Sequence, residues 1–209
     1  MNLSALSANW SAVRLEAFRR RSRLSVAGRL VLAAALAGMT GLAAQVRIPL
    51  PSTPVPATGQ VFAVLLAGAL GGSATGALSQ VLYLAAGIAG VPWFAHASAG
   101  LPLGPSGGYL LGFVPAAAMV GWLTDRHVRL RSIAGQTFLM MLAVGVIYLC
   151  GAVQFALVCR TGLAATLAGA VLPFIPFDLA KALCVAAIAS VILPKGQFNA
   201  DPKGTANVS

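Results

Sequence analysis

The sequence predicts an all-α, polytopic integral membrane protein in which six transmembrane helices form one compact bundle. Only 9% of its 209 residues are charged and 58% are hydrophobic, whereas a soluble domain carries roughly 25% charged residues. Several apolar stretches approach the ~20 residues that a helix needs to cross a bilayer. Cationic residues are dense in some connecting segments and sparse in others, as the positive-inside rule requires. The chain therefore has no room for a soluble catalytic or nucleotide-binding domain.

Six apolar stretches, separated by glycine, proline and charged residues, are the predicted spans. They cover residues 26–46, 60–73, 74–91, 108–124, 133–158 and 163–193. Only Gly71, Gly72 and Ser73 separate the second span from the third, which predicts a tight hinge there. The rest of the chain is a basic extension at 1–25, two notable loops at 47–59 and 91–107, and a tail at 194–209.

The net charge of +10 lies beside the spans, which favours a membrane flank over a surface that binds nucleic acid. If the N-terminus is cytoplasmic, the inner segments hold eleven cationic residues: Arg14, Arg19, Arg20, Arg21, Arg23, Arg29, Arg126, Arg129, Arg131, Lys195 and Lys203. The outer segments then hold only Arg47 and Arg160. We therefore expect both termini in the cytoplasm.

The first span carries Ala33, Ala37 and Gly41 at intervals of four residues. Small residues at this spacing let another membrane helix pack closely. The loop after this span has four prolines in eight residues: Pro49, Pro51, Pro54 and Pro56. This content favours a stiff extended or polyproline II segment over a helix. Such a segment, which also contains Thr53, is either a lid across the bundle or a rigid connector.

The loop at 91–107 and the start of the fourth span combine glycines with aromatic residues. Glycine allows the backbone to approach a ligand or another helix closely. Trp93, Phe94 and Tyr109 are suited to stacking on an apolar ring, but tryptophan and tyrosine also gather at membrane surfaces. Both roles stay open for these residues.

The last span contains Asp178 and Lys181, which lie on one face of a helix because they are three residues apart. A lone charge deep in the bilayer costs at least ~2.5–3.5 kcal/mol, and an apolar replacement for a buried pair is often as stable. The pair therefore predicts a functional site, with a structural pair that fixes helix register as the alternative. Pro173 and Pro176 predict a kink just before it.

The remaining reactive residues do not indicate an enzyme. The cysteines lack metal-ligand spacing, and we expect them to be buried small hydrophobic residues: Cys150, Cys159 and Cys184. The segment Gly104-Pro105-Ser106-Gly107 matches the Gly-x-Ser-Gly of rhomboid proteases, whose serine needs a base within hydrogen-bond reach. Neither histidine, His96 or His127, lies on a later membrane helix, so a protease is rejected.

Three motifs in a fixed order resemble those of a known family. They are Pro-Leu-Pro-x-Thr-Pro-Val-Pro at 49–56, Gly-Pro-x-Gly-Gly-Tyr at 104–109 and Asp-x-x-Lys at 178–181. Together with the apolar stretch 63–89, they are similar to the BioY family, the biotin-specific S components of energy-coupling-factor (ECF) transporters. The resemblance covers about residues 26–193 and leaves out the N-terminal extension.

The resemblance implies an S component in the bacterial inner membrane, which binds biotin from outside without a cofactor or covalent chemistry. Transport would be driven by an ECF-type coupling membrane protein and ABC ATPases, and only these partners would use ATP. The stripe of Ala33, Ala37 and Gly41 would be the docking site of the coupling protein. The 47–59 loop would be the lid, and residues 91–109 would close the pocket.

For the ligand, the resemblance implies contacts with Asp178 and Lys181. Asp178 would accept from the ureido N–H groups of biotin, and Lys181 would donate to the carboxylate or to the ureido oxygen. Family members often have glycine or a small polar residue in place of His96, so either His96 or Ser98 would make a polar contact. Further candidate contacts are Tyr109, Trp93, Gln60, Gln80 and Tyr83.

Two rival functions remain. A self-sufficient secondary carrier would use Asp178 as a proton site, but such carriers usually have more helices and internal repeats, and no convincing repeat is visible. An S component for another vitamin, such as riboflavin or thiamine, is the second rival. A Walker A motif, which would supply energy within the chain, is absent from the sequence.

Overall fold

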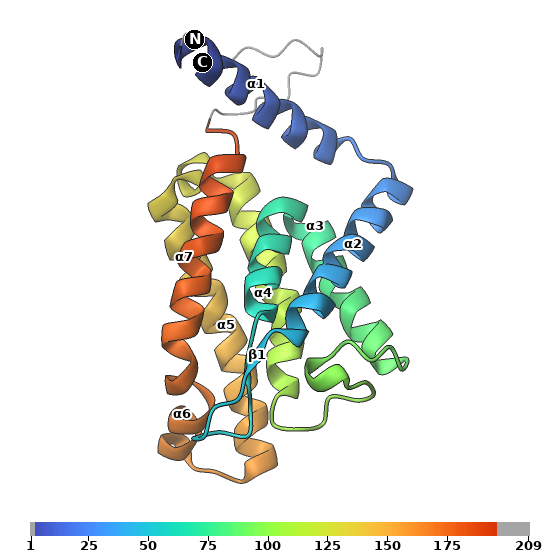
Figure 1. Cartoon of the computed structure of the whole chain (residues 1–209), viewed down its shortest axis with the longest axis vertical. Helices are drawn as coiled ribbons and strands as arrows, with labels where there is room; N and C mark the ends of the chain where they lie inside the picture. Colours follow the sequence, from blue (N-terminus) through green and yellow to red (C-terminus); the bar gives the residue numbers. More distant parts are fainter. Residues whose placement is uncertain (1–2, 196–209) are drawn as a thin grey trace.

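The protein is a helical bundle with one short β-hairpin (Figure 1), seen in a computed structural model that describes residues 3–195. Its helices are α1 (Leu3–Ser22), α2 (Val26–Gln45), α3 (Gln60–Ile88), α4 (Gly107–Arg126), α5 (Ile133–Cys159), α6 (Leu163–Ala170) and α7 (Ile175–Ile192). Strands β1 (Arg47–Ile48) and β2 (Ala57–Thr58) pair antiparallel, with Arg47 opposite Thr58. Three single turns of 3₁₀-helix lie at Ala95–Ala97, Val128–Arg131 and Leu172–Phe174.

The helix α3 is two spans folded against each other. Gly72 has φ 76° and ψ −179°, a conformation that is open to glycine and strained for other residues. A Cβ atom on Gly76 would lie only 3.0 Å from the Cα atom of Gly68, so the chain reverses between these residues. Five helical stretches among residues 3–195 are long and apolar enough to cross a membrane. Since α3 counts as two, the six predicted spans are all present.

The last predicted span is broken, as its two prolines indicated. The short helix α6 ends at Ala170, a 3₁₀ turn follows, and α7 begins at Ile175 with Pro176 in its first turn. Proline is tolerated at this position because the first N–H groups of a helix have no intrahelical partner. The break places Asp178 in the first turn of α7, where the positive end of the helix dipole favours a carboxylate.

The core lies where α3 and α4 meet, and it contains Val64, Leu65, Ala117 and Val120, all of which are fully buried. By contrast, much of α2, α5 and α7 is not covered by the chain. Large apolar side chains on these helices, such as Leu149 on α5, point outward, as lipid-facing residues do.

The prediction that the cysteines are buried is wrong. Cys150 and Cys159 are only partly buried, and Cys184 is exposed on α7. A thiol behaves as a small hydrophobic group, so a lipid-facing position suits it as well as the core does.

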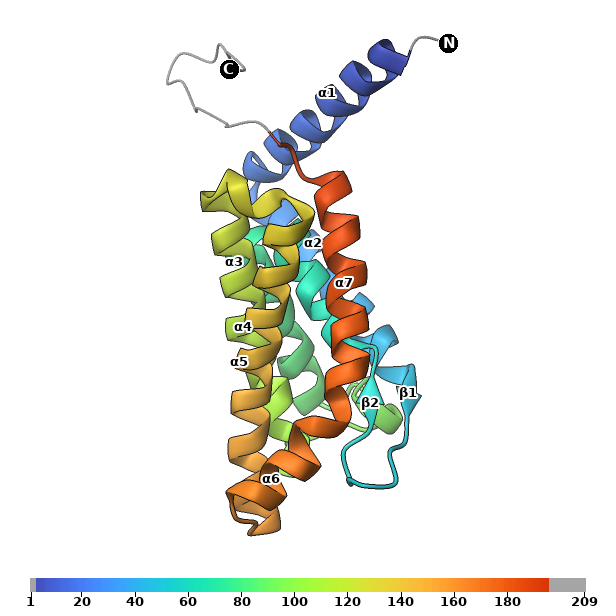
Figure 2. The same cartoon turned by 90° about the vertical axis from the view of Figure 1, so that its left-hand side faces the viewer.

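The basic extension at 1–25 contains the helix α1, which lies at one end of the bundle, opposite α6 and the β-hairpin (Figure 2). Arg21 donates from Nη2 to Asp125 Oδ1 at 2.5 Å and from Nη1 to the Leu70 carbonyl at 3.2 Å. Arg131 is buried and donates to the carbonyls of Thr124, Asp125 and Pro194. These arginines therefore bind carbonyl groups at the ends of three helices, where cations are favourable.

Cationic side chains gather at this α1 end. The described members of the predicted inner set lie on α1, in the link to α2, at the start of α2, between the end of α4 and the start of α5, or just after α7. Lys203 lies outside the described residues. Arg47 and Arg160 belong to the opposite end, in β1 and after α5. The asymmetry seen in the sequence is therefore also an asymmetry between the two ends of the bundle.

The small-residue stripe of α2 does not face outward, which contradicts the docking prediction. Ala33 and Ala37 are 0% and 1% exposed. A Cβ atom on Gly41 would lie 2.9 Å from Cε3 of Trp93. These residues are small because α3 and the loop after it pack against them. The four-residue spacing shows that the three residues share one face of the helix, but it does not show which neighbour covers that face.

Candidate functional site

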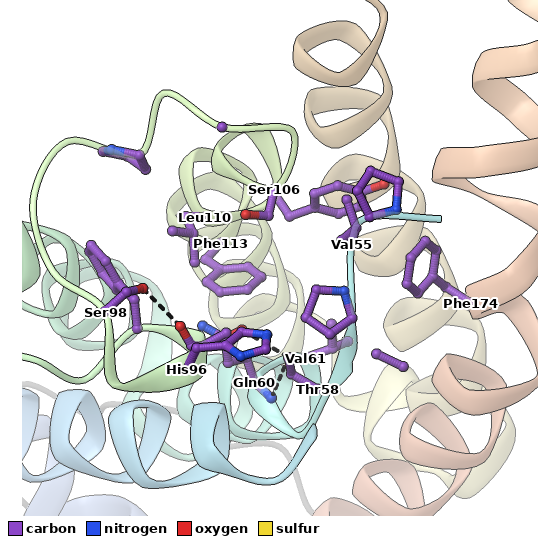
Figure 3. Close-up of a pocket in the computed structure, with 18 of the residues that line it drawn as sticks. Val55, Thr58, Gln60, Val61, His96, Ser98, Ser106, Leu110, Phe113 and Phe174 are labelled. Carbon is purple, nitrogen blue, oxygen red and sulfur yellow. Dashed lines mark hydrogen bonds between the residues drawn. The ribbon is translucent and has the colours of Figure 1, made fainter. Parts of the chain in front are cut away.

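A cavity of about 420 Å³ opens near the hairpin end of the bundle, within the range that is typical of small-molecule sites. Its walls come from the 47–59 loop, the start of α3, the 89–106 loop, α4, α5 and α7. Figure 3 shows side chains from these elements pointing toward the same space, with Phe113 on one side and Phe174 on the other. Segments that are far apart in the sequence thus build one chamber.

Asp178 and Lys181, the pair singled out in the sequence, both line this cavity. Lys181 Nζ donates to Asp178 Oδ1 at 2.7 Å, and Tyr148 Oη donates to Asp178 Oδ2 at 2.8 Å. The Asp178 side chain is 5% exposed and that of Lys181 is 19% exposed. Lys181 and Tyr148 therefore each bind a different oxygen of the Asp178 carboxylate. The ammonium group, which has three donors, makes one hydrogen bond within the described chain.

Tyr109 lines the cavity and also fixes the break between α6 and α7. Its hydroxyl donates to the Ala170 carbonyl at 2.5 Å, at the point where α6 ends. Its ring packs against Phe174 at a centroid distance of 6.0 Å and lies so close to Gly151 that a Cβ there would be 2.5 Å away. Tyr109 is thus both a wall of the pocket and a support for the first turn of α7.

The proline-rich loop is non-helical, as predicted, but only its second half reaches the pocket. Pro54, Val55 and Pro56 line the cavity, and Val55 belongs with Phe174 to a small apolar cluster. The other residues proposed for the lid do not line it: Pro49, Pro51 and Thr53. They lie in the outer part of the hairpin, where Thr53 donates its N–H to the Leu50 carbonyl. Whether this loop moves as a lid stays a prediction.

The 89–106 loop brings both alternatives for the polar contact to the cavity, His96 and Ser98. His96 and Ala97 have φ values of 66° and 50°, a conformation that costs energy for residues other than glycine. Both residues lie in a tight turn closed by the Phe94 N–H, which donates to the Ser98 carbonyl at 3.0 Å. His96 lines the same cavity as Gln60 and Val61 at the start of α3 (Figure 3).

Three predicted ligand contacts do not line the cavity. Tyr83 and Gln80 are fully buried, and Gln80 donates to Thr40 and Ser79 between α2 and α3. Trp93 lies against Gly41, and its indole N–H donates to the Tyr83 carbonyl at 2.9 Å. Their polarity predicted a role, but a polar side chain within the membrane also serves to join two helices.

Gln60, at the start of α3, is a predicted ligand contact that does line the cavity. Its Oε1 accepts from Thr58 Oγ1 at 2.8 Å, and its Nε2 donates to Tyr83 Oη at 2.7 Å. These bonds fix the orientation of the amide and leave one N–H for a further acceptor. Tyr83 therefore acts behind the pocket wall by holding Gln60.

Sequence reasoning missed several lining residues, chiefly Tyr148, Phe113 and Phe174. Tyr148 was detectable in principle, because few side chains in the span 133–158 can form strong hydrogen bonds, the others being Gln136, Thr137 and Gln154. The two phenylalanines carry no such signal, since lipid-facing and pocket-facing rings look alike in a sequence.

The sequence profile of the BioY family matches residues 15–197. A protein of Methanothermobacter thermautotrophicus described as a probable biotin transporter BioY is 41% identical over 143 residues, which cover 64% of this chain and 90% of its own length. The probable biotin transporter BioY of Pyrococcus horikoshii is 37% identical and is covered over 91% of its length. The biotin transporter BioY of Thermotoga maritima is 35% identical and is covered over 86%.

The fold is similar to that of a crystal structure of the S-component for biotin from an ECF-type ABC transporter. The TM-score is 0.72 and the sequence identity is 25%, over 78% of this chain and 88% of that one. The resemblance inferred from three motifs therefore extends to the whole membrane domain.

Proposed function

Because the chain belongs to the BioY family, we propose that it binds biotin in the cavity beside Asp178 and Lys181 and serves as the substrate-capture subunit of an ECF-type transporter. The named relatives are transporters rather than enzymes. The observation that carries the proposal is the ion pair on the cavity wall, with Tyr148 holding its carboxylate. An ionisable pair inside the membrane marks a substrate site by default.

The cavity suits the chemistry of biotin. The ureido ring offers two N–H donors and an oxygen acceptor, which match the Asp178 carboxylate and the donors of Lys181 and Gln60. The fused ring containing sulfur is apolar and fits against Phe113, Phe174 and other apolar walls. A biotin oxygen, from either the ureido group or the carboxylate, would take a second donor of the Lys181 ammonium group.

We propose that the pocket opens to the outside and that α1 and both termini lie in the cytoplasm of a bacterial inner membrane. The support is the concentration of arginines at the α1 end, in accordance with the positive-inside rule. Biotin would then enter past the 47–59 and 89–106 loops. Cytoplasmic ATPases would act on the opposite end through a coupling membrane protein.

The coupling protein would dock on the face of α2 that the chain leaves uncovered. Ala34 and Leu42 are exposed there, and no atom lies within 4 Å of a Cβ built on Gly38. Ala34 and Gly38 are four residues apart and would allow a close approach of another membrane helix. This face replaces the buried stripe that the sequence suggested.

Isothermal titration of the purified protein with biotin, and with riboflavin and thiamine as competitors, tests the substrate. Saturable binding of biotin that the other two vitamins do not displace is the expected result. Binding of riboflavin or thiamine in place of biotin would show a different S component. Proteoliposomes that contain this chain alone test the transport class, because accumulation of biotin against a gradient without ATPases would make it a secondary carrier.

A further inference from the structure

The 89–106 loop forms one wall of the cavity, and two glutamine side chains bind this loop at different points along it. Gln45 is the last residue of α2, and Gln154 lies on α5. The motifs singled out in the sequence include neither of them. Both use the side-chain amide to bind loop backbone groups, which is the kind of contact that gives a loop a fixed path.

Gln45 binds the first half of the loop. Its Nε2 lies 3.2 Å from the carbonyl oxygens of both Trp93 and Phe94, and its Oε1 accepts from the Ala97 N–H at 3.3 Å. The same nitrogen lies 3.1 Å from the Gly41 carbonyl of its own helix. One amide thus joins α2 to the turn that contains the left-handed residues His96 and Ala97.

Gln154 binds the second half. Its Nε2 donates to the carbonyls of Pro102 and Gly104, both at 2.8 Å. The two glycines that follow make room for this contact. A Cβ on Gly107 would lie 2.5 Å from Gln154 Nε2, and one on Gly108 would lie 2.8 Å from Gln154 Cβ. The Gly-Gly pair of the Gly-Pro-x-Gly-Gly-Tyr motif therefore allows the loop to pack closely against α5.

Between these two attachments lies the segment 98–101, which we call the flap. Ser98, Ala99, Gly100 and Leu101 all line the cavity. Three of its four residues are exposed, and one backbone hydrogen bond, from the Gly100 N–H to the Gly87 carbonyl at 2.8 Å, joins it to α3. Its position over the pocket thus depends on how firmly its two ends are held.

We propose that Gln45 and Gln154 are positioning residues that fix the two ends of the flap and thereby set how long a bound ligand stays in the pocket. Neither residue lines the cavity, so neither acts by touching the ligand. The part of this inference that concerns ligand retention rests on the proposed binding of biotin. The part that concerns the path of the loop does not.

The test compares Q45A and Q154A with the wild-type protein, using two readouts. Dissociation of radiolabelled biotin gives the off-rate, and hydrogen exchange of the ligand-free protein reports on the backbone amides of residues 94–104. Each variant is expected to raise the off-rate about tenfold, because anchoring hydrogen bonds are lost, and to speed exchange in the half of the loop that it anchors. Q136A is the matched control. Gln136 also lies on α5 and donates to a backbone carbonyl, that of Leu130, but at the opposite end, so it should lower stability without changing either readout.

The glutamate variants distinguish the loss of specific hydrogen bonds to the loop from a general loosening of the protein. Glutamate at position 45 keeps an acceptor for the Ala97 N–H but loses the donor, so Q45E should recover part of the slow exchange at that amide. Gln154 acts only as a donor, so Q154E should behave like Q154A or worse. Wild-type off-rates and exchange in Q45A and Q154A would overturn the proposal. Faster exchange with an unchanged off-rate would overturn its link to retention. If the wild-type protein binds no biotin, the proposed function fails, and hydrogen exchange alone decides whether the two glutamines fix the loop.

Discussion

The pocket end of the bundle, where Lys181 binds Asp178, and the opposite end, where Arg21 binds Asp125, contain similar ion pairs in different surroundings. The distances between charged atoms are 2.7 Å and 2.5 Å. At the pocket end, the ammonium group has a single hydrogen-bond partner among residues 3–195 and borders a cavity. At the other end, Arg21 also binds the Leu70 carbonyl and lies over the ring of Phe18.

The neighbouring Arg131 shows the contrast most clearly. Its three guanidinium nitrogens all donate to backbone carbonyls, and it lies 4.6 Å from the centre of the Phe18 ring. Burial lowers the pKa of Arg131, whereas the charge of Asp125 raises it. A charge whose three nitrogens each bind a backbone carbonyl inside the protein stabilises the fold. A charge with unused donors beside a cavity is available to a ligand. The surroundings of a membrane ion pair therefore decide its role, and the following experiments test this difference between the two ends of the bundle.

The largest expected effect comes from Lys181→Ala. The change removes a charged contact to the ligand and leaves Asp178 unpaired on the cavity wall, which costs about 2–5 kcal/mol in binding. Biotin affinity should therefore fall about 100-fold, as measured by isothermal titration. Cys184→Ala, at an exposed position on the same helix, is the control and should bind as the wild type does. Wild-type affinity in a folded Lys181→Ala protein would show that the lysine is structural and would remove the contrast between the two ends.

Arg131→Ala should instead destabilise the protein and leave the site intact. It leaves three helix-end carbonyls without a donor, which should cost about 3 kcal/mol, seen as a lower thermal midpoint in detergent. Arg131→Lys should recover little, because one ammonium group cannot reproduce the guanidinium geometry. A large loss of biotin affinity at a temperature where the variant is folded would contradict the separation of the two ends.

Gly72→Ala tests the hinge at the α1 end. Alanine at φ 76° is strained, and its Cβ would lie 2.8 Å from Asp125 Oδ2, so we expect a loss of about 1–3 kcal/mol in stability. Gly145→Ala on α5, where a Cβ meets no atom within 4 Å, is the control. Equal thermal midpoints for the two variants would show that the reversal of α3 does not depend on this glycine.

The smallest effect is expected from Tyr148→Phe, which removes only the hydroxyl that holds Asp178 Oδ2. The loss of one charge-assisted hydrogen bond should weaken biotin binding about tenfold with little change in thermal midpoint. Titration calorimetry and a melting curve on the same preparation measure both. A variant that melts much earlier but binds normally would place Tyr148 with the structural residues of the opposite end.

Much of the fold followed from local patterns. The Gly71–Ser73 hinge, the break at Pro173 and the position of Asp178 just after it were predictable, because glycine and proline act on the backbone where they stand. The wrong predictions concern the direction in which side chains point. Ala33 and Ala37 were expected to face a partner protein, but they are buried within the chain itself. Trp93 and Tyr83 were expected to contact the ligand, but they do not line the pocket. In a membrane protein both the interior and the lipid are apolar, so hydrophobicity does not tell the two faces of a helix apart.

The class of the protein, its six spans, the asymmetry of its charges and the polar pair within the last span follow from composition and spacing along one chain. Three contacts could be found only in the folded protein. Tyr148, thirty residues away, binds Asp178 of that pair, Gln45 and Gln154 bind one loop, and Arg21 reaches Asp125. Such contacts join residues whose separation in sequence carries no information, because the packing of whole helices brings them together.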